Sequence, residues 1–253
     1  MQTVVITGAA KGIGLATAIV FHRAGYDVVL LDKQRPIQIE PDYWQFIPCD
    51  VSDEIQVQQA FTIIAKQNKK INCLVNNAGI QRYGSVSQTS MDQWNEVMNV
   101  NLHSYFLCAK YALPLLLENG YTSIINVASV QSFISQQNVA AYTTAKTAIL
   151  GLTRSIAIDY APHVRCVAVC PGTIDTPMLR EAIALSPNPD AVLMECIQMH
   201  PSGRIGTPEE VAELIFYLSG DKARFINGTA IRIDGGLGIT IGGSKKKTLH
   251  FFI

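Results

Sequence analysis

The chain has 253 residues, of which 48% are hydrophobic and 16% are charged, and its twenty basic residues balance twenty acidic ones. This composition excludes intrinsic disorder, and a zero net charge without a basic stripe argues against nucleic acid as a partner. No run approaches the ~18 apolar residues of a membrane span, and no signal sequence precedes residues 3–7, so we expect a cytoplasmic protein without a membrane partner. The six cysteines lack metal-binding spacing, so we expect reduced core thiols and no metal site.

Short runs rich in Val, Ile and Leu alternate with longer helical patterns along the chain. The runs lack alternating polar residues, which is typical of strands buried on both faces of a parallel sheet. The predicted strands are residues 3–7, 27–31, 44–48, 71–75, 123–127, 165–169 and 230–233. The predicted helices are residues 12–24, 54–68, 91–100, 102–118, 142–160 and 208–219. We therefore predict an α/β protein with a single doubly wound domain of the Rossmann type over residues 1–241, in which helices cover both faces of a seven-stranded parallel sheet.

Three regions depart from this alternation. Residues 32–44 contain two prolines and are too few for a helix, so we expect a loop there. Residues 175–199 follow a Pro-Gly turn and contain the run Ser186-Pro187-Asn188-Pro189, which predicts a helical flap broken by a mobile stretch. Residues 242–253 leave the pattern, and three interpretations stay open for them: a cloning remnant, a flexible tail, or a lid over an active site or a subunit boundary.

A glycine-rich turn follows the first predicted strand and opens the first predicted helix. It reads Thr7-Gly8-Ala9-Ala10-Lys11-Gly12-Ile13-Gly14. Glycine lets the backbone approach a pyrophosphate closely, and the N–H groups at the helix start face the anion. An acidic residue, Asp32, ends the second strand as the dinucleotide-binding fingerprint requires. The sequence therefore predicts a dinucleotide cofactor.

Asp32 also bears on which dinucleotide binds. Its carboxylate can accept hydrogen bonds from the adenosine ribose and would repel a ribose 2′-phosphate, which favours NAD over NADP. Lys11, Lys33 and Arg35 lie close by in sequence and can either compensate a phosphate charge or remain solvated surface residues. We predict NAD, and the strictness of the preference stays open.

Tyr142 and Lys146 lie four residues apart at the start of a predicted helix, so both side chains lie on one face. A nearby ammonium stabilises a phenolate, and we expect it to lower the pKa of Tyr142 toward the working pH. Ser129 ends the fifth strand, where its hydroxyl can bond the substrate oxygen that Tyr142 protonates or deprotonates. This spacing is common by chance in helices, and the position of Ser129 is what makes it informative.

These motifs together resemble the short-chain dehydrogenase/reductase family from residue 3 to residue 236. The residues that carry the resemblance are Thr7–Gly14, Asn76-Asn77-Ala78-Gly79, Asn101, Ser129, Tyr142 with Lys146, Pro171-Gly172 and Asp234-Gly235-Gly236. One departure is Cys170, where the family often has asparagine, and we expect little catalytic consequence from it.

The resemblance implies a role for each catalytic residue. Tyr142 is the general acid and base, Lys146 tunes its pKa and binds the nicotinamide ribose, Ser129 bonds the substrate oxygen, and Asn101 anchors a proton-relay water. Asp50 and Val51 meet the adenine, and the segment after Pro171 faces the nicotinamide. The implied cofactor-binding residues are Gly8, Lys11, Gly12, Ile13, Gly14, Asp32, Asp50, Val51, Asn77, Ala78, Gly79, Tyr142, Lys146, Pro171, Gly172, Thr173, Ile174 and Thr176.

The substrate is predicted less directly. Residues 129–132, 151–157, 159–162, 170–177 and 200–206 are similar to the aldose (D-aldohexose) dehydrogenases of the family, which implies oxidation of a sugar at C1. Several amides near the predicted opening can hydrogen-bond a polyol, although each can equally be a solvated loop residue. The predicted substrate-binding residues are Ser129, Tyr142, Gln81, Gln131 and Gln136, and Arg82 and Gln137 are further polar candidates.

Other functions share these residues. An oxoacyl-thioester reductase or a dihydrodiol dehydrogenase can use the same catalytic group, and a protein that senses dinucleotide without turnover can keep the fold. The predicted helices 102–118 and 142–160 carry apolar residues on more than one face. The family resemblance implies a homotetramer built on these two helices.

Overall fold

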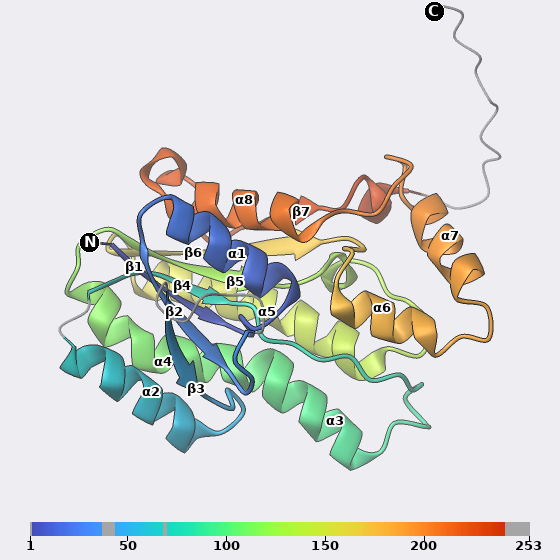
Figure 1. Cartoon of the computed structure of the whole chain (residues 1–253), viewed down its shortest axis with the longest axis horizontal. Helices are drawn as coiled ribbons and strands as arrows, with labels where there is room; N and C mark the ends of the chain where they lie inside the picture. Colours follow the sequence, from blue (N-terminus) through green and yellow to red (C-terminus); the bar gives the residue numbers. More distant parts are fainter. Residues whose placement is uncertain (1, 37–43, 68–69, 241–253) are drawn as a thin grey trace, which may run out of the picture.

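A computed structural model describes residues 2–36, 44–67 and 70–240 of the chain, and it contains one seven-stranded sheet in which all neighbouring strands are parallel (Figure 1). The strand order is β3-β2-β1-β4-β5-β6-β7. The strands are β1 (Thr3–Thr7), β2 (Asp27–Asp32), β3 (Gln45–Pro48), β4 (Ile71–Asn76), β5 (Thr122–Val127), β6 (Val164–Pro171) and β7 (Ala230–Ile233). The predicted Rossmann-type α/β fold is confirmed, and each strand bound lies within two residues of its predicted place.

The central strands form because both of their faces are covered. In β1, Val5 packs into the hydrophobic cluster under α2 and α4, whereas Val4 and Ile6 pack into the cluster under α1 and α8. Successive side chains of a strand point to opposite faces, so a continuous apolar run supplies two cores at once.

Helices lie on both faces of the sheet. In Figure 1, α1 and α8 lie above it, and α2, α4 and α5 lie below it. The helices are α1 (Gly12–Arg23), α2 (Glu54–Lys66), α3 (Met91–Met98), α4 (Ser104–Leu117), α5 (Ala140–Asp159), α6 (Pro177–Ala184), α7 (Pro189–Met199) and α8 (Pro208–Ser219). Short 3₁₀ turns are η2 (Val130–Ser132), η3 (Asp221–Ala223) and η4 (Leu237–Ile239). Some predictions fall outside the described residues. They are the end of the second predicted helix at residue 68, residues 37–43 of the predicted loop, and the predicted tail at residues 242–253.

The predicted break between two helices at Asn101 was wrong. α3 and α4 are joined by a π-helical turn, η1 (Asn99–His103), so residues 91–117 are helical throughout. A π turn adds one residue to the hydrogen-bonded ring and changes which side chains face inward. Asn101 lies in this turn and is completely buried.

The predicted flap consists of α6 and α7. Thr176 and Asn188 cap the two helices with their side-chain oxygens, and a proline follows each cap at the first helical position. Both features stabilise helix starts. Residues 185–188 separate the helices, so the Pro-rich run interrupts the flap where the sequence predicted.

Candidate active site

A cavity of about 570 Å³ opens along the carboxyl ends of the strands. Ligands of doubly wound folds bind at this edge, and the volume is typical of small-molecule sites. The predicted site residues that line it are Gly8, Lys11, Gly12, Ile13, Asp32, Asp50, Val51, Asn77, Ala78, Gly79, Gln81, Ser129, Gln131, Gln136, Tyr142, Lys146, Pro171, Gly172, Thr173, Ile174 and Thr176. Two predicted residues, Gly14 and Asn101, lie behind this wall.

The glycine turn has the shape that a pyrophosphate cradle needs. Gly8 and Gly12 have φ angles of +62° and +59°, a region that disfavours side chains. A Cβ atom at Gly8 would lie 2.7 Å from the Cα atom of Ala78, and one at Gly14 would collide with the carbonyl oxygen of Gly8. Gly14 therefore permits the close packing of α1 on the turn and does not itself form the cavity wall. The turn fits a dinucleotide phosphate.

Asn77 fastens this turn to the end of β4. Its side-chain N–H group donates to the carbonyl oxygens of Thr7, at 3.0 Å, and Gly8, at 2.9 Å. The Thr7 hydroxyl accepts from the backbone N–H groups of Asn77 and Ala78 at 2.9 and 3.1 Å. The two loops are thus locked together before any ligand binds.

Two carboxylates line the cavity near the glycine turn. Asp32 accepts hydrogen bonds from the backbone N–H groups of Ala10 (2.9 Å) and Gln34 (3.1 Å), which hold the carboxylate at the cavity wall. Asp50 pairs with Lys33 at 2.7 Å. Burial raises the pKa of Asp50, but the hydrogen bonds from Lys33 and Ser52 outweigh burial and hold that pKa below its ordinary value.

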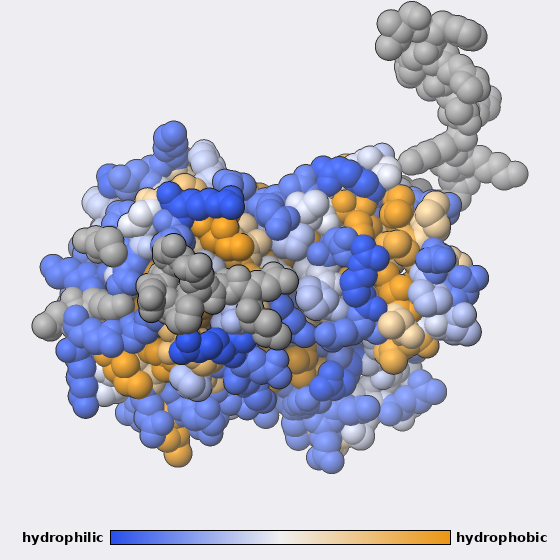
Figure 2. Space-filling view, viewed as in Figure 1, coloured by the Kyte–Doolittle hydropathy of each residue, from blue (hydrophilic) through white to orange (hydrophobic). Residues whose placement is uncertain are grey.

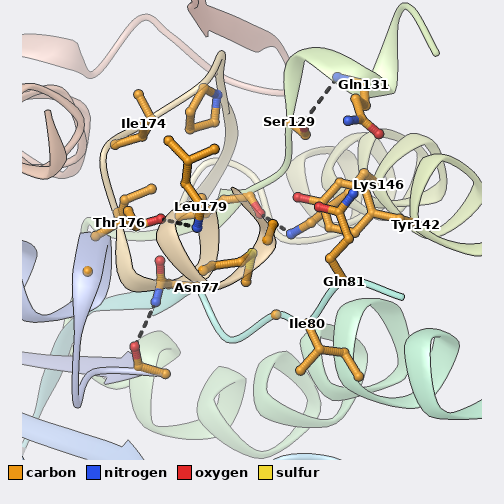
Figure 3. A pocket seen from close by; sticks show the side chains of 18 of the residues that line it. Asn77, Ile80, Gln81, Ser129, Gln131, Tyr142, Lys146, Ile174, Thr176 and Leu179 are labelled. Atoms are coloured by element: carbon orange, nitrogen blue, oxygen red, sulfur yellow. Dashed lines mark hydrogen bonds between the residues drawn. The ribbon is translucent and has the colours of Figure 1, made fainter. Parts of the chain in front are cut away.

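Tyr142, Lys146 and Ser129 lie together in the cavity, as Figure 3 shows. The Lys146 Nζ atom is 5.7 Å from the centroid of the Tyr142 ring. The expected lowering of the Tyr142 pKa is absent here, because burial raises this pKa to about 12 and the hydrogen bond with Ser129 only partly opposes the rise. Burial also lowers the pKa of Lys146 to about 7. Both shifts favour the neutral forms, as expected for groups removed from water.

Asn101 does not line the cavity, and its side chain instead bonds the backbone of Ile80. Its side-chain oxygen accepts from the Ile80 N–H group at 2.8 Å, and its side-chain nitrogen donates to the Ile80 carbonyl at 2.8 Å. The amide therefore holds the backbone next to Gly79 and Gln81, which line the cavity.

Amide side chains lie beside the reactive hydroxyls (Figure 3). The Gln131 side chain donates to the Gln136 side-chain oxygen at 3.3 Å, and its backbone N–H donates to the Ser129 hydroxyl at 3.1 Å. Gln81 lines the same cavity. By contrast, Arg82 is paired with Glu96 at 2.7 Å, and Gln137 is exposed and does not line the cavity.

The flap contributes lining residues that the sequence analysis did not assign. They include the apolar or weakly polar side chains of Met178, Leu179, Ile183, Val192, Cys196 and Met199. Leu179 and Ile183 are four residues apart, as are Val192 and Cys196, so helical periodicity in 175–199 would have revealed this inner face. Figure 2 shows hydrophobic surface over the flap helices at the right of the view.

A dinucleotide cradle beside a Ser-Tyr-Lys group on a doubly wound sheet defines an oxidoreductase that uses a nicotinamide dinucleotide. Within residues 2–36, 44–67 and 70–240, no helix is long and apolar enough to span a membrane. Nor do His, Cys, Asp and Glu side chains of these residues form a group of three or more that could hold a metal ion.

Comparison with known proteins agrees with this class. Residues 8–238 match the family profile described as enoyl-(acyl carrier protein) reductase. The chain belongs to the short-chain dehydrogenase/reductase family. It is 38% identical to "Dehydrogenase/reductase SDR family member 6" of Danio rerio, over 93% of this chain and 96% of the relative.

Two further similarities bear on the type of substrate. The chain is 37% identical to 2-(R)-hydroxypropyl-CoM dehydrogenase of Xanthobacter autotrophicus, over 92% of this chain and 97% of the relative. Its structure resembles that of the aldohexose dehydrogenase of Thermoplasma acidophilum, with a TM-score of 0.93, 41% identity and 97% of each chain covered.

Proposed function

We propose that this protein oxidises an aldose at C1 to the aldonolactone, with NAD as the hydride acceptor. The observation that carries the proposal is the group of amides beside Ser129 and Tyr142, because carboxamides both donate and accept hydrogen bonds, as sugar hydroxyls do. The similarity to an aldohexose dehydrogenase supports the same substrate class.

We assign the proton transfer to Tyr142. The bound dinucleotide supplies the hydride acceptor. Because burial favours the neutral phenol, Tyr142 must first release its own proton, and the resulting phenolate then takes the proton of the C1 hydroxyl while the Ser129 hydroxyl bonds the same oxygen. The Lys146 ammonium favours the phenolate by opposite charge and binds the nicotinamide ribose, and Asn101 anchors the proton-relay path. In the reverse direction Tyr142 returns the proton to the carbonyl oxygen.

The preference for NAD over NADP rests on the charges around Asp32. Asp32 would repel a 2′-phosphate, and the three cations near it in sequence already have partners. Lys11 pairs with Glu181 at 2.9 Å, Lys33 pairs with Asp50 at 2.7 Å, and the Arg35 guanidinium lies over the Phe46 ring, 5.3 Å from its centroid. Each would have to leave a partner to meet a phosphate.

A reductase or dehydrogenase of acyl thioesters is the second candidate function. The inner face of the flap is apolar over Leu179, Ile183, Val192 and Met199, and such a surface suits an acyl chain better than a polyol. A sugar would use the amide side of the cavity, and an acyl chain would use the flap side.

A substrate panel tests the proposal. Aldohexoses, aldopentoses, steroid alcohols and 3-hydroxyacyl thioesters are assayed with NAD and with NADP through the absorbance of the reduced cofactor. We expect turnover of aldoses with NAD and formation of a lactone product. Activity confined to the thioesters would replace the sugar by the second candidate.

Tyr142→Phe is the control variant for this panel. We expect it to bind NADH normally and to lose turnover by about 10²-fold or more, because the phenol is the proposed proton carrier. A wild-type protein that binds NADH but turns over none of these alcohols would instead support a dinucleotide sensor.

A cytoplasmic location and a homotetramer complete the proposed function. All six cysteines have free thiols in the structure, as expected for a reducing compartment. Exposed apolar side chains on α4 and α5, including Phe106 and Ile158, support burial against other subunits.

A further inference from the structure

The side chain of Tyr105 lies behind the wall of the cavity and contacts Lys146, although no motif in the sequence pointed to it. Tyr105 lies in α4 and is completely buried, and its hydroxyl donates to the Val127 carbonyl at 2.8 Å. The Lys146 Nζ atom donates to the same carbonyl at 2.8 Å and to the Tyr105 hydroxyl at 3.2 Å. Three polar groups from α4, β5 and α5 thus form a closed triangle.

The triangle provides acceptors for two of the N–H donors of the Lys146 ammonium. An ammonium group has three N–H donors, and the Tyr105 hydroxyl and the Val127 carbonyl accept two of them. The Tyr105 hydroxyl can accept from Lys146 because its own hydrogen is directed at Val127. The third donor is left for the cavity, which Lys146 lines.

We infer that Tyr105 is a positioning residue for the chemistry proposed above: its hydroxyl holds the Lys146 ammonium against the Val127 carbonyl and so orients the remaining donor toward cofactor and Tyr142. The inference rests on the proposed role of Lys146 and not on the identity of the alcohol.

The hydroxyl also stabilises the charged form of Lys146. Burial lowers the pKa of this lysine to about 7, so its charge near neutral pH depends on the acceptors around it. The titratable groups that face the ammonium are the phenols of Tyr105 and Tyr142 and the thiol of Cys170. A neutral hydroxyl that accepts from the ammonium raises the lysine pKa, so its removal lowers that pKa further.

Tyr105→Phe tests the inference with the full-length protein. The titration of Lys146 is followed by NMR of ¹³C-labelled lysine, with its signal assigned through its loss in Lys146→Arg. We expect the acid dissociation constant of Lys146 to rise about tenfold, which is the effect of one hydrogen bond to a charged group. We also expect kcat to fall about tenfold while KM for the alcohol stays within twofold, since Tyr105 does not line the cavity.

Tyr111→Phe is the matched control, because this tyrosine lies on the same helix and bonds Glu54 outside the cavity. It should leave both quantities unchanged. Tyr105→Met, which also lacks the hydroxyl, replaces Tyr105→Phe if the latter does not fold. An unchanged Lys146 titration in a folded Tyr105 variant overturns the inference. The titration needs no substrate, so it keeps its meaning even if the sugar panel fails.

Discussion

Among single residues, Asp32 is the one on which the proposed cofactor preference depends most. Both of its carboxylate oxygens accept backbone N–H groups, so the charge is fixed at the cavity wall. In Asp32→Asn, we expect the preference for NADH over NADPH to shrink at least tenfold, because a hydrogen bond to a charged group is worth about 1.5–3 kcal/mol and the repulsion of the 2′-phosphate disappears.

Fluorescence titration with both reduced cofactors measures this change. Asp92→Asn, at the start of α3, removes the same charge away from the cavity and serves as the control. An unaltered affinity ratio in Asp32→Asn would show that other groups select the cofactor.

The flap helix α7 is bonded to the loop after β6 through one buried side chain, that of His200. His200 follows α7, and its Nδ1 atom bonds the Cys196 carbonyl at 2.7 Å. Because a carbonyl accepts, Nδ1 carries the proton, and the unprotonated Nε2 atom accepts from the Thr173 N–H at 3.2 Å. The ring therefore connects α7 to the loop after β6 that lines the cavity.

His200→Phe keeps a ring of similar size and removes both bonds. We expect the free energy of unfolding to fall by about 1–3 kcal/mol, as for buried groups that lose their partners. We also expect KM for the alcohol to rise more than kcat falls, because the flap loses its bond to Thr173. Urea unfolding and steady-state kinetics measure both effects. His163→Phe, at an exposed turn, is the control, and lower stability with an unchanged KM would limit His200 to folding.

The elements also show how far sequence reasoning reaches. The strands and the cavity edge were predictable because hydrophobic periodicity and glycine turns are local signals. The π turn around Asn101 was not, since it shifts the helical periodicity by one residue next to a segment that is apolar on more than one face, where such a shift cannot be recognised. The pKa of Tyr142 depends on burial by distant segments, and Tyr105 in an apolar helix looks like an ordinary core residue.

Two helices on the surface of the molecule, α4 and α5, carry exposed apolar side chains. Phe106 on α4 is 48% exposed and Ile158 on α5 is 79% exposed. If these helices bury against other subunits, light scattering should give four times the mass of one chain, and Phe106→Glu or Ile158→Glu should lower it because a charge is costly in an apolar interface. Val86→Glu is the control, because Val86 is an apolar residue in a turn and is 84% exposed. This variant should leave the measured mass unchanged. A monomeric wild-type protein would contradict the proposal.

The bonds from Asn77 to Thr7 and Gly8 have a thermodynamic consequence. They order the glycine turn during folding, so the conformational entropy of that turn is lost before the cofactor binds. Association then requires little further ordering, which leaves more of the interaction energy for affinity. The same bonds join β4 to β1, so weakening them would lower folding stability and cofactor affinity together.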